Sequence, residues 1–143
     1  MGLRVFVDTG PLLLAYRTAP LTERILKARE LVLLNPDEHE FVGSKFLELE
    51  LLPKADYFGH VEEAAGYREY FRRCIRTKLT YPKIVNHAWY LGVLYGMAAM
   101  DSLHMSVAQH ARCDVFVTTE NETKALYRAK GISIVHIDDL PLR

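Results

Sequence analysis

The sequence predicts an α/β domain in which a central parallel sheet of four to five strands lies between two layers of helices. The first observation is that longer segments with helical patterning separate four short, mainly apolar runs, at 5–7, 41–43, 115–117 and 132–137. Strands separated by helices pair in parallel through crossover connections, which place helices on both faces of the sheet. The second observation is that apolar residues follow one another without alternation, as in strands buried on both faces.

Capping and helix-breaking residues define the segments between the strands. The predicted helices span 12–16, 22–34, 45–52, 59–78, 83–98, a segment that begins at 101, and 121–130. Ser44 is the expected N-cap of the third helix, and Pro53 is expected to close it. Pro82 is expected to break the chain between the fourth and fifth helices, and Gly131 to end the last one. Asp101 is expected at or near the N-cap of its helix.

Length and composition limit the class of protein. At 143 residues the chain is predicted to form a single domain over 1–143. Lysine plus arginine and aspartate plus glutamate balance at 18 each, so a polyanion could be bound only through a local patch or through metal ions. Cys74 and Cys113 have no metal-ligand spacing, which favours a reduced cytoplasmic setting. No targeting segment is expected, and the apolar run 84–100 is too short and polar for a membrane span.

Four carboxylates occupy positions where metal-binding or catalytic groups are expected. Asp8 ends the first strand, and ligands gather beyond the carboxyl ends of strands in open α/β sheets. Glu50 lies in the helix after the second strand, Asp101 opens a helix, and Glu120 follows the third strand. Without a cation, such a cluster would be repulsive and would raise some of the carboxyl pKa values. Hard divalent cations prefer oxygen ligands, so the pattern predicts a metal-dependent site.

Each of these carboxylates also has a purely structural interpretation. Asp8 and Asp101 could act only as turn or cap residues, because such positions favour aspartate for backbone hydrogen bonding. Glu120 could interact only with the dipole of the following helix. Glu48 is the alternative to Glu50, because the two side chains point to different faces of one helix and one of them is expected to be solvated.

Other polar residues near the predicted strand ends are interpreted as structural. Asp114 precedes the third strand and so lies at its wrong end, and Glu122 is expected to be a solvated helix residue. His104 is expected to be a hydrogen-bonded helical histidine rather than a ligand or a general base. The other histidines show no paired spacing, so a zinc site is not predicted; they include His87, His110 and His136.

The charged stretch 59–78 places Arg68, Arg72 and Arg76 on one face of a helix. This basic face is interpreted either as solvated and balanced by nearby glutamates or as a surface that contacts RNA phosphates. The aromatic residues in and after this stretch are expected to pack helices or to form a dimer interface rather than to stack on bases: Tyr67, Tyr70, Phe71, Trp89, Tyr90 and Tyr95.

Four segments that carry the acidic residues occur in a characteristic order. They are V-F-V-D-T-G at 5–10, S-K-F-L-E-L-E-L-L-P-K-A at 44–55, M-D-S-L-H-M-S-V-A at 100–108 and D-V-F-V-T-T-E at 114–120. This order resembles a PIN domain, the nuclease fold of many prokaryotic toxin–antitoxin toxins and of several eukaryotic RNA-processing enzymes. The resemblance covers essentially the whole chain and implies a three-layer α/β/α PIN-like fold.

The resemblance implies roles for the residues at matching positions. Asp8 and Asp101 would be direct ligands of Mg²⁺ or Mn²⁺, and Glu50 would act through water. The Thr118–Thr119 pair resembles the threonine or serine usually found beside the fourth acidic residue. Glu120 stands where many members have aspartate. Because glutamate is one methylene longer, direct ligation and ligation through water both remain open for Glu120.

The function implied by the resemblance is that of a Mg²⁺- or Mn²⁺-dependent endoribonuclease. A water would attack an RNA phosphodiester in line and leave a 5′-phosphate and a 3′-hydroxyl. The biological role implied is the toxin of a type II toxin–antitoxin pair, a homodimer with no membrane association that a small antitoxin protein silences. The first alternative is a catalytically weak PIN-like module that binds RNA or protein. The second is a haloacid-dehalogenase-type phosphatase, which normally has a second aspartate where this chain has Gly10.

Overall fold

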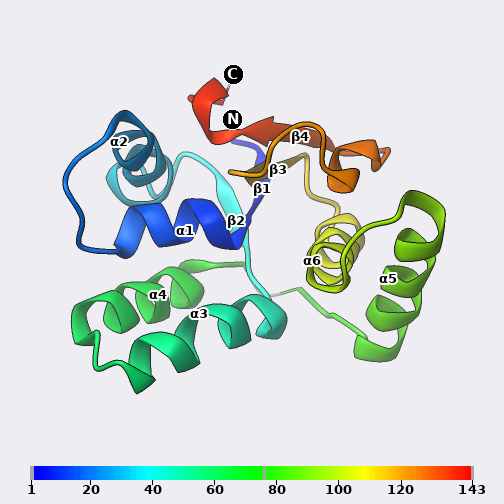
Figure 1. Cartoon of the computed structure of the whole chain (residues 1–143), viewed down its shortest axis with the longest axis horizontal. Coiled ribbons are helices and arrows are strands. Elements are labelled where there is room, and N and C mark those ends of the chain that lie inside the picture. The colour runs from blue at the N-terminus through cyan, green and yellow to red at the C-terminus, as the bar shows by residue number, and fades with distance from the viewer. Residues whose placement is uncertain (1, 76, 143) are drawn as a thin grey trace.

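The computed structural model describes residues 2–75 and 77–142. Its centre is a four-stranded parallel sheet with the strand order β2-β1-β3-β4 (Figure 1). The strands are β1 (Arg4–Val7), β2 (Glu40–Val42), β3 (Val115–Thr118) and β4 (Ser133–His136). Val5 pairs with Phe41 of β2 on one side and with Val115 of β3 on the other. The parallel sheet predicted from the apolar runs is confirmed.

Helices cover both faces of this sheet. They are α1 (Thr9–Tyr16), α2 (Glu23–Arg29), α3 (Lys45–Tyr57), α4 (Val61–Arg73), α5 (Tyr81–Tyr95) and α6 (Ala99–His110). Figure 1 shows α1 and α2 on one side of the sheet and α5 and α6 on the other. The α3–α4 pair packs as a hairpin that contacts α1 through both of its helices and α6 through α3. The predicted three-layer α/β/α architecture is therefore confirmed.

Three short helical segments complete the described chain. A π-helical stretch, η1 (Glu30–Leu34), prolongs α2, and two 3₁₀ segments, η2 (Ala125–Arg128) and η3 (Ile137–Asp139), flank β4. Within residues 2–75 and 77–142, no helix combines the length and the apolar character that crossing a bilayer requires.

The core is built on the two central strands. Phe6 of β1 and Phe116 of β3 are fully buried, and their stacked ring centroids lie 5.1 Å apart. Tyr67 and Tyr70 of α4 are also buried, and both meet the ring of Tyr16 in α1 edge to face. These two tyrosines pack helices, as the sequence predicts for them.

One helix continues past its predicted end. The sequence predicts that Pro53 closes the helix after β2, but α3 runs through Pro53 to Tyr57. Leu47, Leu51 and Ala55 are buried along one face of this helix. The packing of this face continues beyond the proline and outweighs the one backbone hydrogen bond that a proline cannot make.

The predicted helix over 121–130 is wrong apart from the short η2. The side-chain oxygen of Asn121 accepts a hydrogen bond from the Thr123 N–H (3.0 Å). The backbone carbonyl oxygen of Asn121 accepts one from the Lys124 N–H (2.9 Å). Such an Asx turn competes with helix formation. Glu120 therefore does not precede an α-helix, and the expected interaction with a helix dipole is absent at this position.

Two other helix starts differ from the predicted ones. Pro82 lies in the first turn of α5 rather than breaking the chain before it, because its missing N–H costs no hydrogen bond at that position. The N-cap of α6 is Ala98, so Asp101 is the third residue of the helix. Asp101 is therefore near the N-cap, as predicted, and only the alternative in which it serves merely as the cap is wrong.

The strand order creates a topological switch between β1 and β3. The chain passes from β1 to β2 on one side and then returns to β3 on the other side of β1. In open α/β sheets, ligands bind beyond the carboxyl ends of the strands at such a point. The residues that follow β1 and β3 are therefore the starting point for the functional site.

Candidate functional site

Asp8 lies directly after β1 at the topological switch. Its N–H donates to the carbonyl oxygen of Val117 in β3 (2.9 Å), which extends the ladder between the two strands by one residue. One carboxylate oxygen accepts from the Thr9 N–H (2.8 Å) and the other from the Thr118 hydroxyl (3.0 Å). Asp8 is the N-cap of α1, but a carboxylate oxygen has more than one acceptor site, so the cap can also bind a cation.

The environment of Asp8 disfavours its negative charge. The residue is only 7% exposed, and this burial raises the pKa of its carboxyl group. The charge of His104 and the hydrogen bonds from Thr9 and Thr118 oppose the rise, while the charge of Glu50 adds to it. A buried carboxylate of this kind is stabilised in its charged form by a nearby cation.

Glu50 reaches the same region from α3. Its Oε1 accepts hydrogen bonds from the Thr9 hydroxyl (2.8 Å) and from Nε2 of His104 in α6. The hydrogen bond with His104 is the main cause of a lowered pKa for Glu50, and the bond from Thr9 contributes to it. Both donors use one carboxylate oxygen, so Oε2 stays available to a ligand while the side chain is held from two elements.

The structure separates Glu48 from Glu50. Glu48 forms an ion pair with Lys45 one turn earlier in α3 (3.4 Å), whereas Glu50 is bonded to the residue that follows Asp8. The structure therefore brings Glu50, the predicted residue, to the candidate site.

His104 is hydrogen-bonded and helical, as the sequence predicts, but its partner is a candidate site residue. Its ring is 1% exposed, and it packs against Phe6 with ring centroids 5.5 Å apart. Among the described residues, its Nδ1 has no hydrogen-bond partner. The contact with Glu50 was missed by the sequence reasoning, although the one-turn spacing from Asp101 places both side chains on neighbouring parts of one helix face.

Asp101 lies in the first turn of α6 and is half-buried. Burial raises the pKa of Asp101, and the negative charges of Asp8, Glu120 and Glu50 raise it further. The four predicted acidic residues therefore share one electrostatic environment, although they come from four different segments of the chain.

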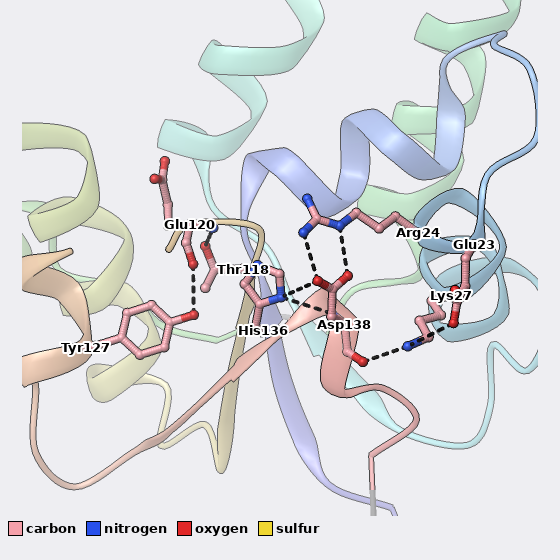
Figure 2. A network of polar contacts seen from close by, with 8 residues as sticks. All are labelled: Glu23, Arg24, Lys27, Thr118, Glu120, Tyr127, His136 and Asp138. Carbon is pink, nitrogen blue, oxygen red and sulfur yellow. Dashed lines mark hydrogen bonds and ion pairs between the residues drawn. The ribbon is translucent and has the colours of Figure 1, made fainter. Parts of the chain in front are cut away.

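The segment after β3 anchors the fourth acidic residue through its backbone. The Glu120 N–H donates to the hydroxyl of Thr118 (3.1 Å), and the Tyr127 hydroxyl donates to the carbonyl oxygen of Glu120 (2.9 Å). Figure 2 shows both contacts and the Glu120 carboxylate directed away from Tyr127. The Glu120 carboxylate is therefore left for a ligand, while the Thr118 hydroxyl links the Glu120 backbone to the Asp8 carboxylate.

The two threonines at the end of β3 have different surroundings. Thr118 is fully buried and bonds to Asp8, whereas Thr119 lies against Gly10 at the start of α1. A Cβ atom at position 10 would overlap the Thr119 hydroxyl. Gly10 therefore allows the two chain segments that carry Asp8 and Glu120 to approach each other closely.

The oxygen donors of the four acidic residues fit a hard divalent cation that keeps several of its waters. All four acidic side chains supply oxygen, and burial of Asp8 and Asp101 favours a compensating positive charge. Within residues 2–75 and 77–142, no three histidine, cysteine, aspartate or glutamate side chains are already arranged around one metal position. Mg²⁺ typically uses one or two carboxylates and keeps several waters, so the residues present fit such a cation without a closed cage.

A second polar cluster joins α2 to the end of β4 (Figure 2). Arg24 donates two hydrogen bonds of 2.8 Å to the Asp138 carboxylate, and Lys27 Nζ donates to the Asp138 carbonyl oxygen (2.6 Å). The Asp138 N–H donates to Nδ1 of His136, the last residue of β4 (3.0 Å). The hydrogen bond from Arg24 lowers the pKa of Asp138. The cluster orients α2 against the edge of the sheet. Because it is exposed, it adds little to the free energy of unfolding.

The two described arginines of the predicted basic face are paired with acids. Arg68 donates to Asp56 (2.6 Å), and Arg72 forms two hydrogen bonds with Glu69 (2.6 and 2.9 Å). Arg76 lies outside the described residues. The arrangement favours the interpretation as a balanced solvated face, and it supports no separate phosphate site on α4.

Asp114 is structural, as predicted. Its carboxylate accepts from the Arg4 N–H (2.8 Å), and its N–H donates to the Arg4 carbonyl oxygen (2.7 Å). These bonds join the amino ends of β1 and β3, at the edge of the sheet opposite to the acidic residues.

Solved structures share the fold of this chain. A chain of a toxin–antitoxin complex from Klebsiella pneumoniae aligns with a TM-score of 0.65 and 14% identity, over 93% of this chain and 97% of that chain. A chain of VapBC2 from Rickettsia felis, bound to a DNA fragment from its promoter, gives a TM-score of 0.66 and 14% identity over 94% and 98%. A chain of DNA-bound VapBC from Salmonella typhimurium gives a TM-score of 0.66 and 18% identity, over 94% of this chain and 98% of that chain.

The comparisons by sequence find no match. No protein-family profile matches the chain, and no curated protein matches it. At identities of 14% to 18%, the likeness to the solved structures is one of fold, and it confirms the predicted three-layer PIN-like fold.

Proposed function

We propose that this chain, a domain with a PIN-like fold, is a Mg²⁺- or Mn²⁺-dependent endoribonuclease. The observation that carries the proposal is the convergence of Asp8, Glu50, Asp101 and Glu120 at the topological switch of the sheet. The negative charges of the other three raise the pKa of Asp101, while the charge of His104 lowers it. Such a cluster suits a site whose positive charge comes from a bound divalent ion.

The proposed roles combine the family resemblance with the contacts of these residues. Asp8 and Asp101 would hold the cation directly, and Glu120 and Glu50 would hold it directly or through water. When bound, the cation would lower the pKa of a water and offset the charge that develops on the phosphate. Thr118 fixes the carboxylate of Asp8 and the backbone of Glu120. Thr9 and His104 fix Glu50, which we propose orients the attacking water.

We further propose that the protein is the toxin of a toxin–antitoxin pair. The structures similar in fold include a toxin–antitoxin complex, which supports an antitoxin protein as partner. The outer face of α5 supports a homodimer, because Trp89, Tyr90 and Val93 are 79%, 62% and 75% exposed there. Exposed apolar faces of this kind are typical of interaction surfaces.

Metal removal tests the proposed activity. We expect the purified protein to cut a mixed RNA substrate in Mg²⁺ or Mn²⁺, and we expect EDTA to abolish the cleavage, because the carboxylates alone repel the phosphodiester. Adding back excess Mn²⁺ to the same sample should restore it, which excludes irreversible unfolding. Cleavage that persists in EDTA would contradict the metal-dependent mechanism.

A non-cleaving module that binds RNA or protein is the second candidate. It is favoured by the absence, among the described residues, of three metal-binding side chains already placed around one point. RNA retained intact in a gel shift, with no cleavage in either metal and no rise of the unfolding temperature on adding metal, would make this candidate the better one.

We predict that His104 is a positioning residue for Glu50. Replacing it in His104→Phe keeps a ring against Phe6 but removes the donor to Glu50. Loss of such a supporting hydrogen bond typically weakens metal affinity by about 10–100-fold. We expect this loss in a Mn²⁺ titration followed by electron paramagnetic resonance, with the unfolding temperature of the metal-free protein nearly unchanged.

Two further variants separate positioning from folding. His104→Gln retains an N–H donor and should recover part of the Mn²⁺ affinity. Thr9→Val keeps the volume of the side chain but removes the second donor to Glu50. It should therefore weaken Mn²⁺ binding while the buried residues of α6 stay as they are in the wild type. Wild-type Mn²⁺ affinity in both His104→Phe and Thr9→Val would refute the role.

A further inference from the structure

The tertiary structure brings together two histidines that are far apart in the sequence. His87 lies in the middle of α5, and His110 is the last residue of α6. Their ring centroids are 4.9 Å apart, with an angle of 68° between the ring planes. Their spacing along the chain gives no sign of this pair, because it is the packing of α5 on α6 that brings the two rings together.

Ser106 in α6 determines which nitrogen of each ring carries the proton. Its hydroxyl donates to the Ile84 carbonyl oxygen (2.9 Å), and this uses its one hydrogen. Nδ1 of His87, 3.0 Å from the same hydroxyl oxygen, must therefore be the donor in that contact. Nδ1 of His110 lies 2.8 Å from the Ser106 carbonyl oxygen and must likewise donate.

This assignment leaves Nε2 of each neutral ring with a free lone pair. In the described part of the chain, the hydrogen bonds of both rings are made through Nδ1. Metal-binding histidines typically donate the other ring N–H to a backbone carbonyl or a similar acceptor, which orients the ring and fixes the tautomer. His87 and His110 already have this supporting arrangement in the absence of metal.

The surroundings of the pair favour a bound cation. Burial and the neighbouring His110 lower the pKa of His87, so the ring is kept in the neutral form that binds metals. His110 ends a helix of twelve residues, and the carboxyl end of a helix carries a partial negative charge. A cation there would interact favourably with this partial charge.

We propose that Nε2 of His87 and Nε2 of His110 bind one borderline transition-metal ion, of the class of Cu²⁺, Ni²⁺ or Zn²⁺, in the seam between α5 and α6. A metal about 2.0–2.1 Å from each nitrogen lies about 3 Å from each ring centroid. Centroids 4.9 Å apart are within the roughly 6 Å that two such rings on one ion can span, so both rings are close enough to share a metal. Water completes the coordination.

The proposed site differs in chemistry from the acidic site. Imidazole nitrogen selects copper, nickel and zinc, whereas carboxylate oxygen suits magnesium and manganese. None of the four predicted acidic residues belongs to the pair. The proposal therefore stands independently of the ribonuclease function and can fail or succeed without it.

The test uses untagged full-length protein and Cu²⁺ as the probe, with excess Mg²⁺ present to occupy the acidic site. We expect the electron paramagnetic resonance spectrum to carry nitrogen hyperfine coupling from two imidazoles. His110→Gln, a change at an exposed residue, and His87→Gln should each weaken Cu²⁺ binding at least about tenfold, because one of two protein ligands is lost. Asp8→Asn should bind Cu²⁺ as the wild type does.

The matched control is His60→Gln, which removes an exposed histidine outside the pair. It should leave both the affinity and the spectrum unchanged. Circular dichroism of each metal-free variant checks the fold, and His110→Gln provides the test if His87→Gln disturbs the contact with Ser106. Wild-type Cu²⁺ affinity in His110→Gln, or a spectrum with oxygen ligands only, would overturn the proposal.

Discussion

The Asp8→Asn variant is expected to lose RNA cleavage by about 10²-fold or more while it remains folded. Asp8 is the acidic residue nearest to the topological switch, and it is linked through Thr118 to Glu120 and through Thr9 to Glu50. Removing a charged group that stabilises charge in a transition state typically costs a factor of this size. A fixed-time cleavage assay in Mg²⁺ and in Mn²⁺ measures the loss.

The same substitution should leave the stability of the fold unchanged or raise it. Asparagine keeps the shape of aspartate and can still accept a hydrogen bond from the Thr9 N–H. Burial raises the pKa of Asp8, so its ionised form is disfavoured in the metal-free fold. Replacing the carboxylate by a neutral amide removes the free-energy cost of burying that charge. Residues that serve function at a cost in stability typically behave in this way. Thermal unfolding in EDTA should therefore give a temperature at least as high as that of the wild type.

Asp37→Asn is the matched control, because Asp37 is exposed in the turn before β2. It should keep full activity. An Asp8→Asn protein that is folded and cuts RNA at the wild-type rate would remove Asp8 from the active site. A folded but markedly less stable one would instead identify Asp8 mainly as the cap of α1.

Phe6→Ala should destabilise the protein by about 3–5 kcal/mol, the typical cost of truncating a buried phenylalanine. Phe6 is fully buried in a central strand and stacks on Phe116, so its truncation would leave a cavity inside the core. Domains of this size have only about 5–15 kcal/mol of total stability, so a large part would be lost. Urea unfolding followed by far-ultraviolet circular dichroism measures the change.

Phe58→Ala provides the control of the same residue type. Phe58 follows α3 and is 65% exposed, so its truncation should change the unfolding free energy by no more than about 0.5 kcal/mol. Equal destabilisation by the two variants would contradict the assignment of the core. Because the Phe6 ring also packs on His104, the Phe6→Ala protein should bind Mn²⁺ less tightly even under conditions where it stays folded.

The architecture was largely predictable from the sequence because it depends on local patterns. The buried strands are short apolar runs, and crossover connections make such strands parallel. Ser44 was correctly predicted as the N-cap of α3, where it accepts from the Leu47 N–H (3.1 Å). Such a cap depends only on residues within one turn, so the sequence contains all the information that determines it.

The predictions that failed concern segments in which distant packing or side-chain turns compete with propensity. Pro53 does not end α3, because burial of Leu51 and Ala55 maintains the helix on either side of it. The helix predicted after Glu120 is replaced by the turn at Asn121, because its side chain offers the backbone an alternative hydrogen bond. Local propensity alone could not decide either case.

By itself, the sequence determined the α/β class, the strands and the candidate acidic residues of this protein, because periodicity and residue type are local properties. Only the tertiary structure decided which groups meet. It joined His104 to Glu50 across two helices and paired His87 with His110. The physical reason is that such contacts form where separate helices pack against one sheet. The residues involved are far apart in the sequence, so their spacing along the chain does not predict that they meet.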